Sequence, residues 1–374
     1  MNSRKLRNFA FSLHRYIGLA VGLILVIVGL TGSLLVFSDE LDAALVKQQF
    51  GRVIPQEKTL PLEAIANSVK VNYANKTEYQ IHQFDLNFDP NIYRVRLKNS
   101  DDRQLEVFVN PYTAEIIGDR PRDNAFFTKV VKLHYALLAG TFGGIIVGIS
   151  ALLLFILTVT GLILWSGWRN LLSGFKVKLN ASIKRKNYDI HKVSGIVALV
   201  FLAMISISGF CWNFYPITEP AIYSLTFSPP PPEVKSTPTG KETLALSEII
   251  TKAKAAISNG ELSFISVPTE PDGVFRIFMK QPGDIHHHAN QVKIDRYSGE
   301  ILYVVTRETA NLGDRIHTAF KPMHYGTFGG VPTRILYVFV GLSPTVLFVT
   351  GLTMYRLRRR SKLQTSVNRE LIQR

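Results

Sequence analysis

The chain has 374 residues, of which 47% are hydrophobic, and its 43 Lys and Arg against 28 Asp and Glu give a formal net charge of +15. A chain that is both this apolar and this basic is unusual among soluble globular proteins and points first to a membrane. Its single cysteine, Cys211, excludes an intrachain disulfide, a paired-cysteine metal site and a covalent haem attachment motif.

Four uncharged apolar stretches are long enough to cross a bilayer as helices, which takes about 20 residues each. The first is too long for the apolar region of a cleaved secretory signal, so we interpret it as an uncleaved anchor. The sequence therefore predicts four transmembrane helices, at residues 17–37, 145–165, 193–215 and 335–355.

Positive charge is concentrated in three segments of the chain. Residues 1–16, 166–192 and 356–374 hold 18 Lys and Arg and 2 Asp and Glu, whereas segments 38–144 and 216–334 hold 25 and 26. An excess of Lys and Arg marks cytoplasmic segments of membrane proteins. We therefore expect both termini in the cytoplasm, two periplasmic domains in a bacterial inner membrane, lipid as the surrounding medium and no nucleic-acid partner.

The chain contains an internal duplication of helix, domain and helix. His14 and His191 open the first and third spans, and a Thr-Gly or Ser-Gly pair begins 17 residues after each. His134 and His324 precede the second and fourth spans, and a Thr-Gly pair begins 26 residues after each. A Gly-Thr-Phe-Gly-Gly element lies near both, at 140–144 and 326–330, displaced by four positions relative to the histidine.

The long segments between the spans repeat as well. Residues 109–115 correspond to 294–300, each a turn between strand-like residues. Amphipathic helical stretches at 62–71 and 244–257 precede alternating strands at 93–97 and 274–279. The predicted fold is a membrane α-helical four-helix bundle with two periplasmic α+β domains. Its parts are the N-terminus with the first span (1–37), domain 1 (38–133), the second span (134–165), a basic loop (166–192), the third span (193–215), domain 2 (216–323), the fourth span (324–355) and a basic tail (356–374).

Four of the nine histidines stand at repeat-equivalent positions and form two pairs, each histidine near the first turn of the following span. His14 and His191 are expected at the cytoplasmic edge, and His134 and His324 at the periplasmic edge. Two neutral imidazoles presented from two helices are the axial ligand set of a b-type haem, which needs no cysteine. A single interfacial histidine is more often a polar anchor, but the duplicated placement favours iron ligation in two haem b groups.

Glycines support this prediction at the cytoplasmic pair. Gly18 and Gly195 lie four residues after His14 and His191, on the same helix face, where a side chain would collide with the porphyrin. The Ser/Thr-Gly pairs are instead interpreted as helix packing, together with Gly22, Gly29 and Gly148. The aromatic residues near helix ends, Trp165, Trp168, Trp212, Tyr215 and Tyr355, are interpreted as an interfacial belt, although one of them could lie beside a porphyrin and pass electrons.

Other histidines leave alternatives open. His317, seven residues before His324, could replace it as the outer ligand or add a site. The run His286, His287 and His288 in a polar loop could bind exposed iron or a chelate, or could simply be a solvated hairpin tip. His82 has a weaker claim.

Several motifs together resemble the PepSY-associated transmembrane family, over about residues 8–360. They are Leu-His-Arg-Tyr-Ile-Gly-Leu before the first span, the turns Asn-Pro-Tyr-Thr-Ala-Glu and Asp-Arg-Tyr-Ser-Gly-Glu, and Thr-Gly-Leu-Ile-Leu-Trp closing the second span. Members are bacterial inner-membrane proteins, often iron-regulated, and the branch resembled comprises haem-containing reductases of ferric siderophores. The resemblance implies an enzyme that reduces Fe(III) in a periplasmic siderophore and releases Fe(II), with haem b held by His14, His134, His191 and His324.

The donor of electrons stays open, because the cytoplasmic loop is too short for a nucleotide-binding domain. Quinol and a cytoplasmic flavin reductase are both compatible with the sequence. Two alternatives to a reductase also remain: a non-catalytic protein that restrains a periplasmic protease or senses a ligand, and a transporter for iron or a chelate. Haem content distinguishes the reductase from both.

Overall fold

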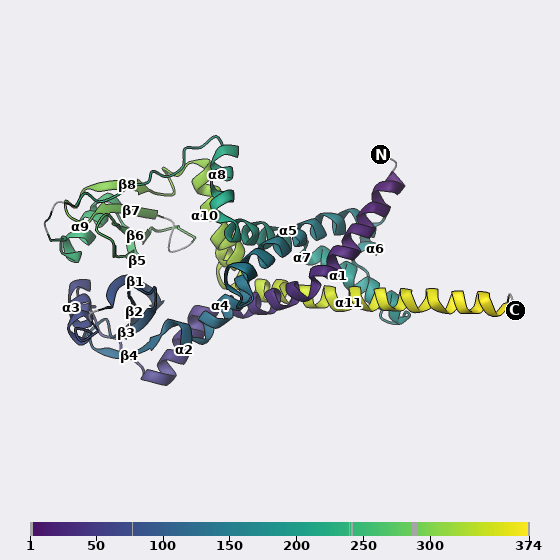
Figure 1. Cartoon of the computed structure of the whole chain (residues 1–374), viewed down its shortest axis with the longest axis horizontal. Helices are drawn as coiled ribbons and strands as arrows, with labels where there is room; N and C mark the ends of the chain where they lie inside the picture. Colours follow the sequence, from purple (N-terminus) through teal and green to yellow (C-terminus); the bar gives the residue numbers. More distant parts are fainter. Residues whose placement is uncertain (1–2, 77, 239, 241, 286–289, 373–374) are drawn as a thin grey trace. The chain divides into compact units, whose positions relative to one another are not determined.

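A computed structural model describes residues 3–76, 78–238, 240, 242–285 and 290–372 (Figure 1). The chain divides into two compact units. The helical unit comprises Met1–Val36, Val130–Thr218 and Met323–Arg374, and the sheet unit comprises Phe37–Lys129 and Glu219–Pro322. The chain therefore enters and leaves the sheet unit twice, as the duplication requires.

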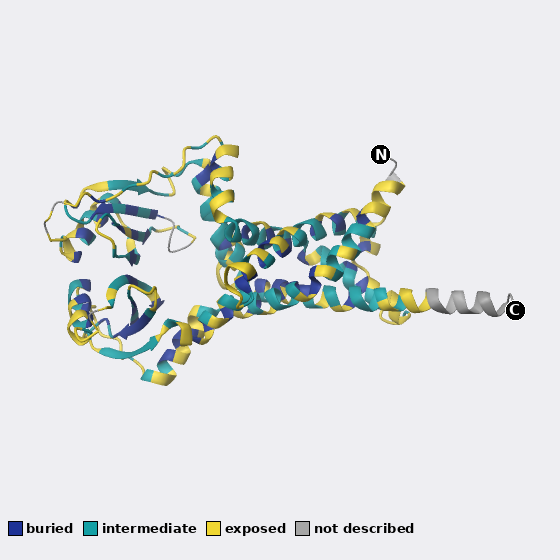
Figure 2. Cartoon of the chain, viewed as in Figure 1, coloured by how far each residue is buried: buried dark blue, intermediate teal, exposed yellow. Residues whose placement is uncertain are grey.

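Four long helices form the helical unit: α1 (Ser3–Leu35), α5 (Gly140–Leu164), α7 (Ile183–Asn213) and α11 (Gly330–Ile372). Each contains a candidate membrane span, so the prediction of four membrane-length apolar helices is confirmed. Between 22% and 33% of the most apolar window of each span is buried, and Figure 2 shows many exposed and half-buried residues along these helices. Lipid hydrocarbon is the medium that such apolar outer faces require, and the chain is a membrane protein.

The four helices are arranged as a ring. α1 packs against α5 and α11, and α7 packs against the same two helices. The loop between α5 and α7 carries a short 3₁₀ turn, η2 (Ser166–Trp168), and α6 (Leu171–Phe175). Because α1 and α7 each pack against both α5 and α11, α1 and α7 occupy opposite corners of the ring. The same holds for α5 and α11.

Two short helices, α4 (Phe126–Ala136) and α10 (Leu312–Tyr325), precede α5 and α11. The chain breaks after α4 at residues with positive φ, ending at Gly140 (φ 54°), and after α10 at Gly326 (φ 70°), which leads into η3 (Thr327–Gly329). Glycine tolerates this backbone region without a Cβ clash. α5 and α11 both begin six residues after the preceding histidine, at 140 and 330, although the Gly-Thr-Phe-Gly-Gly elements are displaced.

The sheet unit contains one antiparallel sheet of eight strands in the order β4-β3-β2-β1-β5-β6-β7-β8. The first segment supplies β1 (Gln80–Asp89), β2 (Ile92–Lys98), β3 (Gln104–Val109) and β4 (Ile116–Pro121). The second supplies β5 (Glu261–Ser266), β6 (Val274–Lys280), β7 (Asn290–Asp295) and β8 (Ile301–Val305). A 3₁₀ turn, η1 (Arg122–Asn124), follows β4.

Helices flank this sheet. α3 (Leu62–Asn72) and α9 (Leu246–Ala256) are repeat equivalents, and α2 (Ser38–Phe50) and α8 (Tyr215–Leu225) follow α1 and α7 along the chain. The helical and strand stretches expected from the sequence pattern lie in α3, α9, β2 and β6. The fold is therefore helical and membrane-like with an antiparallel sheet.

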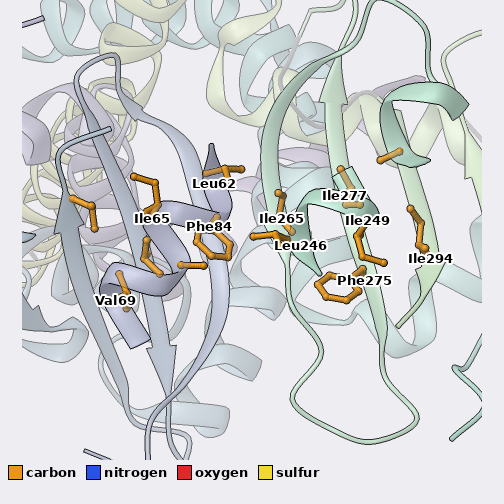
Figure 3. Close-up of a cluster of buried hydrophobic side chains, with 14 of the residues drawn as sticks. Leu62, Ile65, Val69, Phe84, Leu246, Ile249, Ile265, Phe275, Ile277 and Ile294 are labelled. Atoms are coloured by element: carbon orange, nitrogen blue, oxygen red, sulfur yellow. The ribbon is translucent and has the colours of Figure 1, made fainter. Parts of the chain in front are cut away.

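The two segments outside the spans, each of which was expected to form an α+β domain, share one sheet and one buried core. β1 pairs with β5 through three registered pairs, including Phe84 with Ile265. Side chains from α3 and α9 belong to one buried cluster, which Figure 3 shows extending from Ile65 and Phe84 to Ile249 and Ile277. Pairing the edges β1 and β5 satisfies backbone groups that two isolated sheets would leave open.

Beneath α2, one face of the sheet carries a buried charged cluster. Glu106 of β3 is 2% exposed and accepts hydrogen bonds from Arg96 on β2 (3.2 Å) and Arg120 on β4 (3.0 Å). Arg120 also donates to Asp42 of α2 at 3.0 Å. Burial alone would raise the pKa of Glu106, but Arg94, Arg96 and Arg120 lower this pKa below its ordinary range. The carboxylate is therefore ionised and holds α2 to the sheet through Arg120.

The equivalent cross-strand residues in the second half are uncharged. The alignment of 109–115 with 294–300 places Gln291 where Glu106 stands. Glu106 pairs across the sheet with Arg96 and Arg120, whereas Gln291 pairs with Phe278 and Val305. The charged cluster thus belongs to the first half alone.

Candidate functional site

The helical unit brings the four repeat-equivalent histidines together as two pairs. The ring centroids of His14 on α1 and His191 on α7 are 6.1 Å apart, with an angle of 79° between the ring planes. The rings of His134 on α4 and His324 on α10 are also 6.1 Å apart, at 84°. In each pair the two histidines come from different repeat halves.

The positions of these histidines differ from the expectation that each lies near the first turn of the following span. His14 and His191 lie well inside α1 and α7, because both helices begin earlier in the chain than predicted. His134 and His324 lie in the last turns of α4 and α10, which the glycine-containing breaks separate from α5 and α11. Local apolarity does not reveal either feature. Residues that include several Lys and Arg extend α1 and α7 beyond their apolar stretches, and backbone breaks end α4 and α10.

Each histidine contacts a hydroxyl on a neighbouring helix through Nδ1. The four partners are the Thr or Ser residues of the repeated Thr-Gly and Ser-Gly pairs: Thr160 for His14 (2.9 Å), Thr31 for His134 (3.1 Å), Thr350 for His191 (3.0 Å) and Ser208 for His324 (2.8 Å). These contacts are reciprocal within each half, because α1 and α5 support the histidines of the first half and α7 and α11 those of the second.

The hydrogen-bond pattern fixes the imidazole tautomer. The hydroxyl of Thr160 already donates to Ile156 O at 2.8 Å, so it accepts from His14 Nδ1–H. His134 and His191 also donate from Nδ1 to backbone carbonyls, Val28 O at 2.9 Å and Leu347 O at 3.0 Å, and a carbonyl can only accept. With Nδ1 protonated, the lone pair of the neutral ring is on Nε2, which is the usual state of a metal-binding histidine.

The glycine of each pair lies against the same imidazole. A Cβ added at Gly32 would come within 2.9 Å of His134 Cε1, and one at Gly161 or Gly209 within 3.4 Å of His14 or His324 Cε1. At Gly351 the corresponding distance to His191 Cε1 is 3.5 Å. The Ser/Thr-Gly pairs therefore form the seats of the histidine rings, a role that the packing interpretation missed. The constant offsets of 17 and 26 residues are the sequence signal for it.

Other glycines divide into two kinds. A side chain at Gly22 would clash with Phe348, and one at Gly29 with the backbone of Gly341, so their interpretation as close-packing residues is confirmed, as it is for Gly148 against Phe214.

Gly18 and Gly195 differ from these close-packing glycines. A Cβ at either would only make ordinary contacts, 3.8 Å from Leu157 and 3.6 Å from Leu347. Packing of the polypeptide alone therefore does not require glycine at Gly18 or Gly195, and the prediction that both leave room for a porphyrin stays a prediction.

The remaining candidate histidines are not part of the two pairs. His317 lies on α10 within the sheet unit, where its ring is 6.2 Å from that of Phe320, and His324 is the residue beside His134. His82 lies on β1, where burial, with Lys98, Arg96 and Arg122, lowers its pKa and favours the neutral form. His286, His287 and His288 lie outside the described residues.

The pairs suit a ligand that needs two imidazoles and supplies its own other donors. Within the part of the chain that the structure describes, no group of three or more His, Cys, Asp or Glu could hold a metal ion. A metal bonded to two imidazoles at about 2.0–2.1 Å would hold their centroids roughly 6 Å apart, which is close to the 6.1 Å of both pairs. Two neutral histidines across a helical bundle are the donor set of a macrocycle-bound iron.

Comparison with known families agrees with this architecture. The family described as PepSY-associated TM region matches residues 11–358. The chain belongs to this family. The match covers all four spans and both extramembrane segments, so the resemblance of the sequence motifs is confirmed over nearly the whole chain. A search of curated proteins finds no match.

Proposed function

We propose that this PepSY-associated TM protein is an inner-membrane haem b oxidoreductase that reduces ferric siderophores in the periplasm and releases Fe(II). The observation that carries the proposal is the duplicated pairing of His14 with His191 and of His134 with His324. Bound haem b would supply one-electron transfer, so that each Fe(III) chelate reduced to Fe(II) takes one electron from a donor such as quinol or a cytoplasmic flavin reductase.

The residues of the chain would bind and orient the cofactor. With Nδ1 as the donor, Nε2 of each histidine carries no proton and can bind iron. The hydroxyl of Thr160, or its equivalent, accepts the hydrogen bond from Nδ1 on the opposite side of the ring. Partners behind a ligating histidine fix its orientation and raise its basicity, and their loss typically costs about 10–100-fold in metal affinity. Both pairs have such partners at both histidines.

The positive-inside pattern supports the direction of transfer. Basic residues cluster in the segments expected in the cytoplasm, on the side of the His14–His191 pair, and the sheet unit is expected in the periplasm. A folded unit of this size offers the surface on which a chelate of several hundred daltons could bind. The siderophore as substrate rests on the family resemblance.

The deciding experiment is a dithionite-reduced optical spectrum of the purified protein with pyridine haemochrome quantification. We expect a haem b spectrum and two haem equivalents per chain. Reduced protein should then be reoxidised by ferric siderophore under anaerobic conditions, with Fe(II) captured by a specific chelator. Absence of a Soret band, also after haem reconstitution, would refute the reductase and favour a non-catalytic or transport role.

A reduced, haem-loaded protein that reacts with quinone but with no ferric chelate would refute only the siderophore as substrate. The topology has its own test, because a reporter active only in the cytoplasm should work when fused near Lys178 and fail within residues 85–120 or 240–300.

A further inference from the structure

The four histidine seats differ at one position. Four residues after the hydroxyl residue of each seat, the same helix face carries Leu35, Leu164, Met354 or, in the seat of His324, Trp212. Three seats therefore have a flexible aliphatic side chain at this point. Only the seat of His324 has an aromatic ring.

Trp212 lies directly against His324. Their ring centroids are 4.8 Å apart at a tilt of 45°, and the indole is 5.9 Å from the ring of Tyr325, nearly perpendicular to it. One helix, α7, supplies the Ser208 hydroxyl, the backbone at Gly209 and the ring of Trp212 around His324. An indole has few rotamers and a large flat surface, so it restrains a neighbouring ring more than leucine does.

The opposite histidine of this pair has the same kinds of hydrogen-bond partner, a hydroxyl and a backbone group, since His324 bonds both Ser208 and the backbone of Ile205. His134 donates to Thr31 and to Val28 O, and a Cβ at Gly32 would be closer to it than at any other seat. Leu35 stands where Trp212 stands in the second half. The His134–His324 pair is thus asymmetric, whereas the His14–His191 pair has aliphatic residues, Leu164 and Met354, at both equivalent positions.

We infer that Trp212 is a positioning residue that fixes the ring plane of His324 and covers it with apolar surface, which makes the His134–His324 centre electronically different from the His14–His191 centre. The inference rests on the proposed function, since it needs haem at both pairs. Orientation of an axial imidazole and the polarity around it are among the levers by which a protein tunes a haem. A change in the imidazole plane and in the surface packed over it shifts the reduction potential of this centre, so Trp212 sets a potential that a leucine at this position would not reproduce.

The test compares Trp212→Leu, which copies the first half, with Trp212→Phe, which keeps a flat ring. Haem content, low-temperature EPR and potentiometric titration are measured on the full-length protein in detergent. In Trp212→Leu we expect two haems, a shifted largest g value in one of the two low-spin signals, a shifted midpoint potential for that centre, and no change in the other. Trp212→Phe should restore most of the wild-type signal, and Trp168→Leu should change neither.

Each failure has a distinct meaning. Two haems with both EPR signals and both potentials unchanged in Trp212→Leu would overturn the role of Trp212 and leave the proposed function intact. A shift in Trp212→Phe as large as in Trp212→Leu would also overturn it, because the ring plane would then not depend on an aromatic neighbour; this comparison decides the matter if Trp212→Leu loses the centre altogether. Wild-type protein without haem would refute the proposed function itself.

Discussion

The helical unit and the sheet unit have preserved the internal duplication to different degrees. In the helical unit, both halves place a histidine, a hydroxyl and a glycine at equivalent positions, and all four histidines make equivalent contacts. In the sheet unit, the strands of the two halves correspond. Glu106 and its cross-strand neighbours are charged, whereas Gln291 and its cross-strand neighbours are not. The backbone repeats in both units, whereas the side-chain chemistry repeats only in one.

The difference follows from what each half must do. A histidine pair needs one member from each half, so a change on either side removes the pair. In the sheet unit, α2 packs on the first half, and the halves meet through the β1–β5 pairing, the apolar core that includes Phe84 and Ile265, and hydrogen bonds such as that from Ser247 N to Glu63. The two halves have equivalent side chains at the histidine pairs, where each half supplies one member. They have different side chains at Glu106 and Gln291, which contact residues of their own half.

The largest expected effect comes from removing one histidine. His14→Ala and His191→Ala should each lower the haem content from about two equivalents to about one, because a six-coordinate site loses most of its affinity with one axial ligand gone. Pyridine haemochrome analysis of the purified variants measures this loss. His82→Ala and His317→Ala are the controls and should keep both haems. Retention of both haems in the two ligand variants would contradict the assignment of His14 and His191 as ligands.

The next effect concerns the charged cluster. Glu106→Gln removes the carboxylate that Arg96 and Arg120 share, while Arg120 keeps Asp42, and breaking a buried ion pair costs about 3–5 kcal/mol. Thermal unfolding of the sheet unit within the full-length protein measures the change, with haem content as a check on the helical unit. The matched variant Gln291→Leu should cost less than about 1 kcal/mol, because its cross-strand partners are uncharged.

The pH dependence of unfolding sharpens the same contrast. The pKa of Glu106 is lower in the folded protein than its ordinary value, so its contribution to stability is present above the ordinary glutamate range and is lost as the pH falls through the lower folded value. The difference in unfolding temperature between wild type and Glu106→Gln should therefore be constant near neutrality and shrink in acid. A difference that grows on acidification would contradict this sign.

A smaller, graded effect is expected from the glycine seats. Gly32→Ala should weaken haem binding most, by about 5- to 150-fold, the factors that correspond to overpacking of about 1–3 kcal/mol. Gly161→Ala and Gly209→Ala should have weaker effects and Gly351→Ala the weakest, following the distances of 2.9, 3.4, 3.4 and 3.5 Å. Haem titration of the apoproteins gives the order, and a reversed order would show that the seats do not set the fit.

The smallest effect should come from removing a hydroxyl, because a backbone carbonyl still accepts from the same histidine. Thr350→Val and Thr31→Val leave Leu347 O and Val28 O as acceptors for Nδ1, so their haem affinity should fall less than 10-fold, below the usual range for such partners. Equilibrium haem transfer to a competing apoprotein is the measurement. A loss of a whole equivalent in either variant would mean that the carbonyl does not hold the ring.

Much of this architecture could be predicted from the sequence, for reasons that lie in its local patterns. Apolar length identifies α1, α5, α7 and α11, and alternation identifies strands such as β2 and β6, because each of these signals is contained in neighbouring residues. Repetition then singles out the four histidines. The pairing of His14 with His191 follows from equivalent positions in the two halves.

Features that depend on contacts between distant segments could not be predicted. The pairing of β1 with β5 joins residues that no local period relates, so the shared sheet could not be predicted from the sequence. The Thr-Gly pair at 160–161 was recognised as a repeat marker, but its contact with His14 lies on another helix. Trp212 was one of several aromatic residues near helix ends until its contact with His324 distinguished it.

The ring arrangement of α1, α5, α7 and α11 has a consequence for how the protein is made. Neither histidine pair can close while only the first half of the chain has left the ribosome, because each needs a residue of α7 or α10. The support of His191 by Thr350 comes later still, with the last span. Binding of the proposed cofactor at the His14–His191 pair would therefore be a late step of biogenesis, and a chain truncated before α11 would hold this pair without the Thr350 hydroxyl.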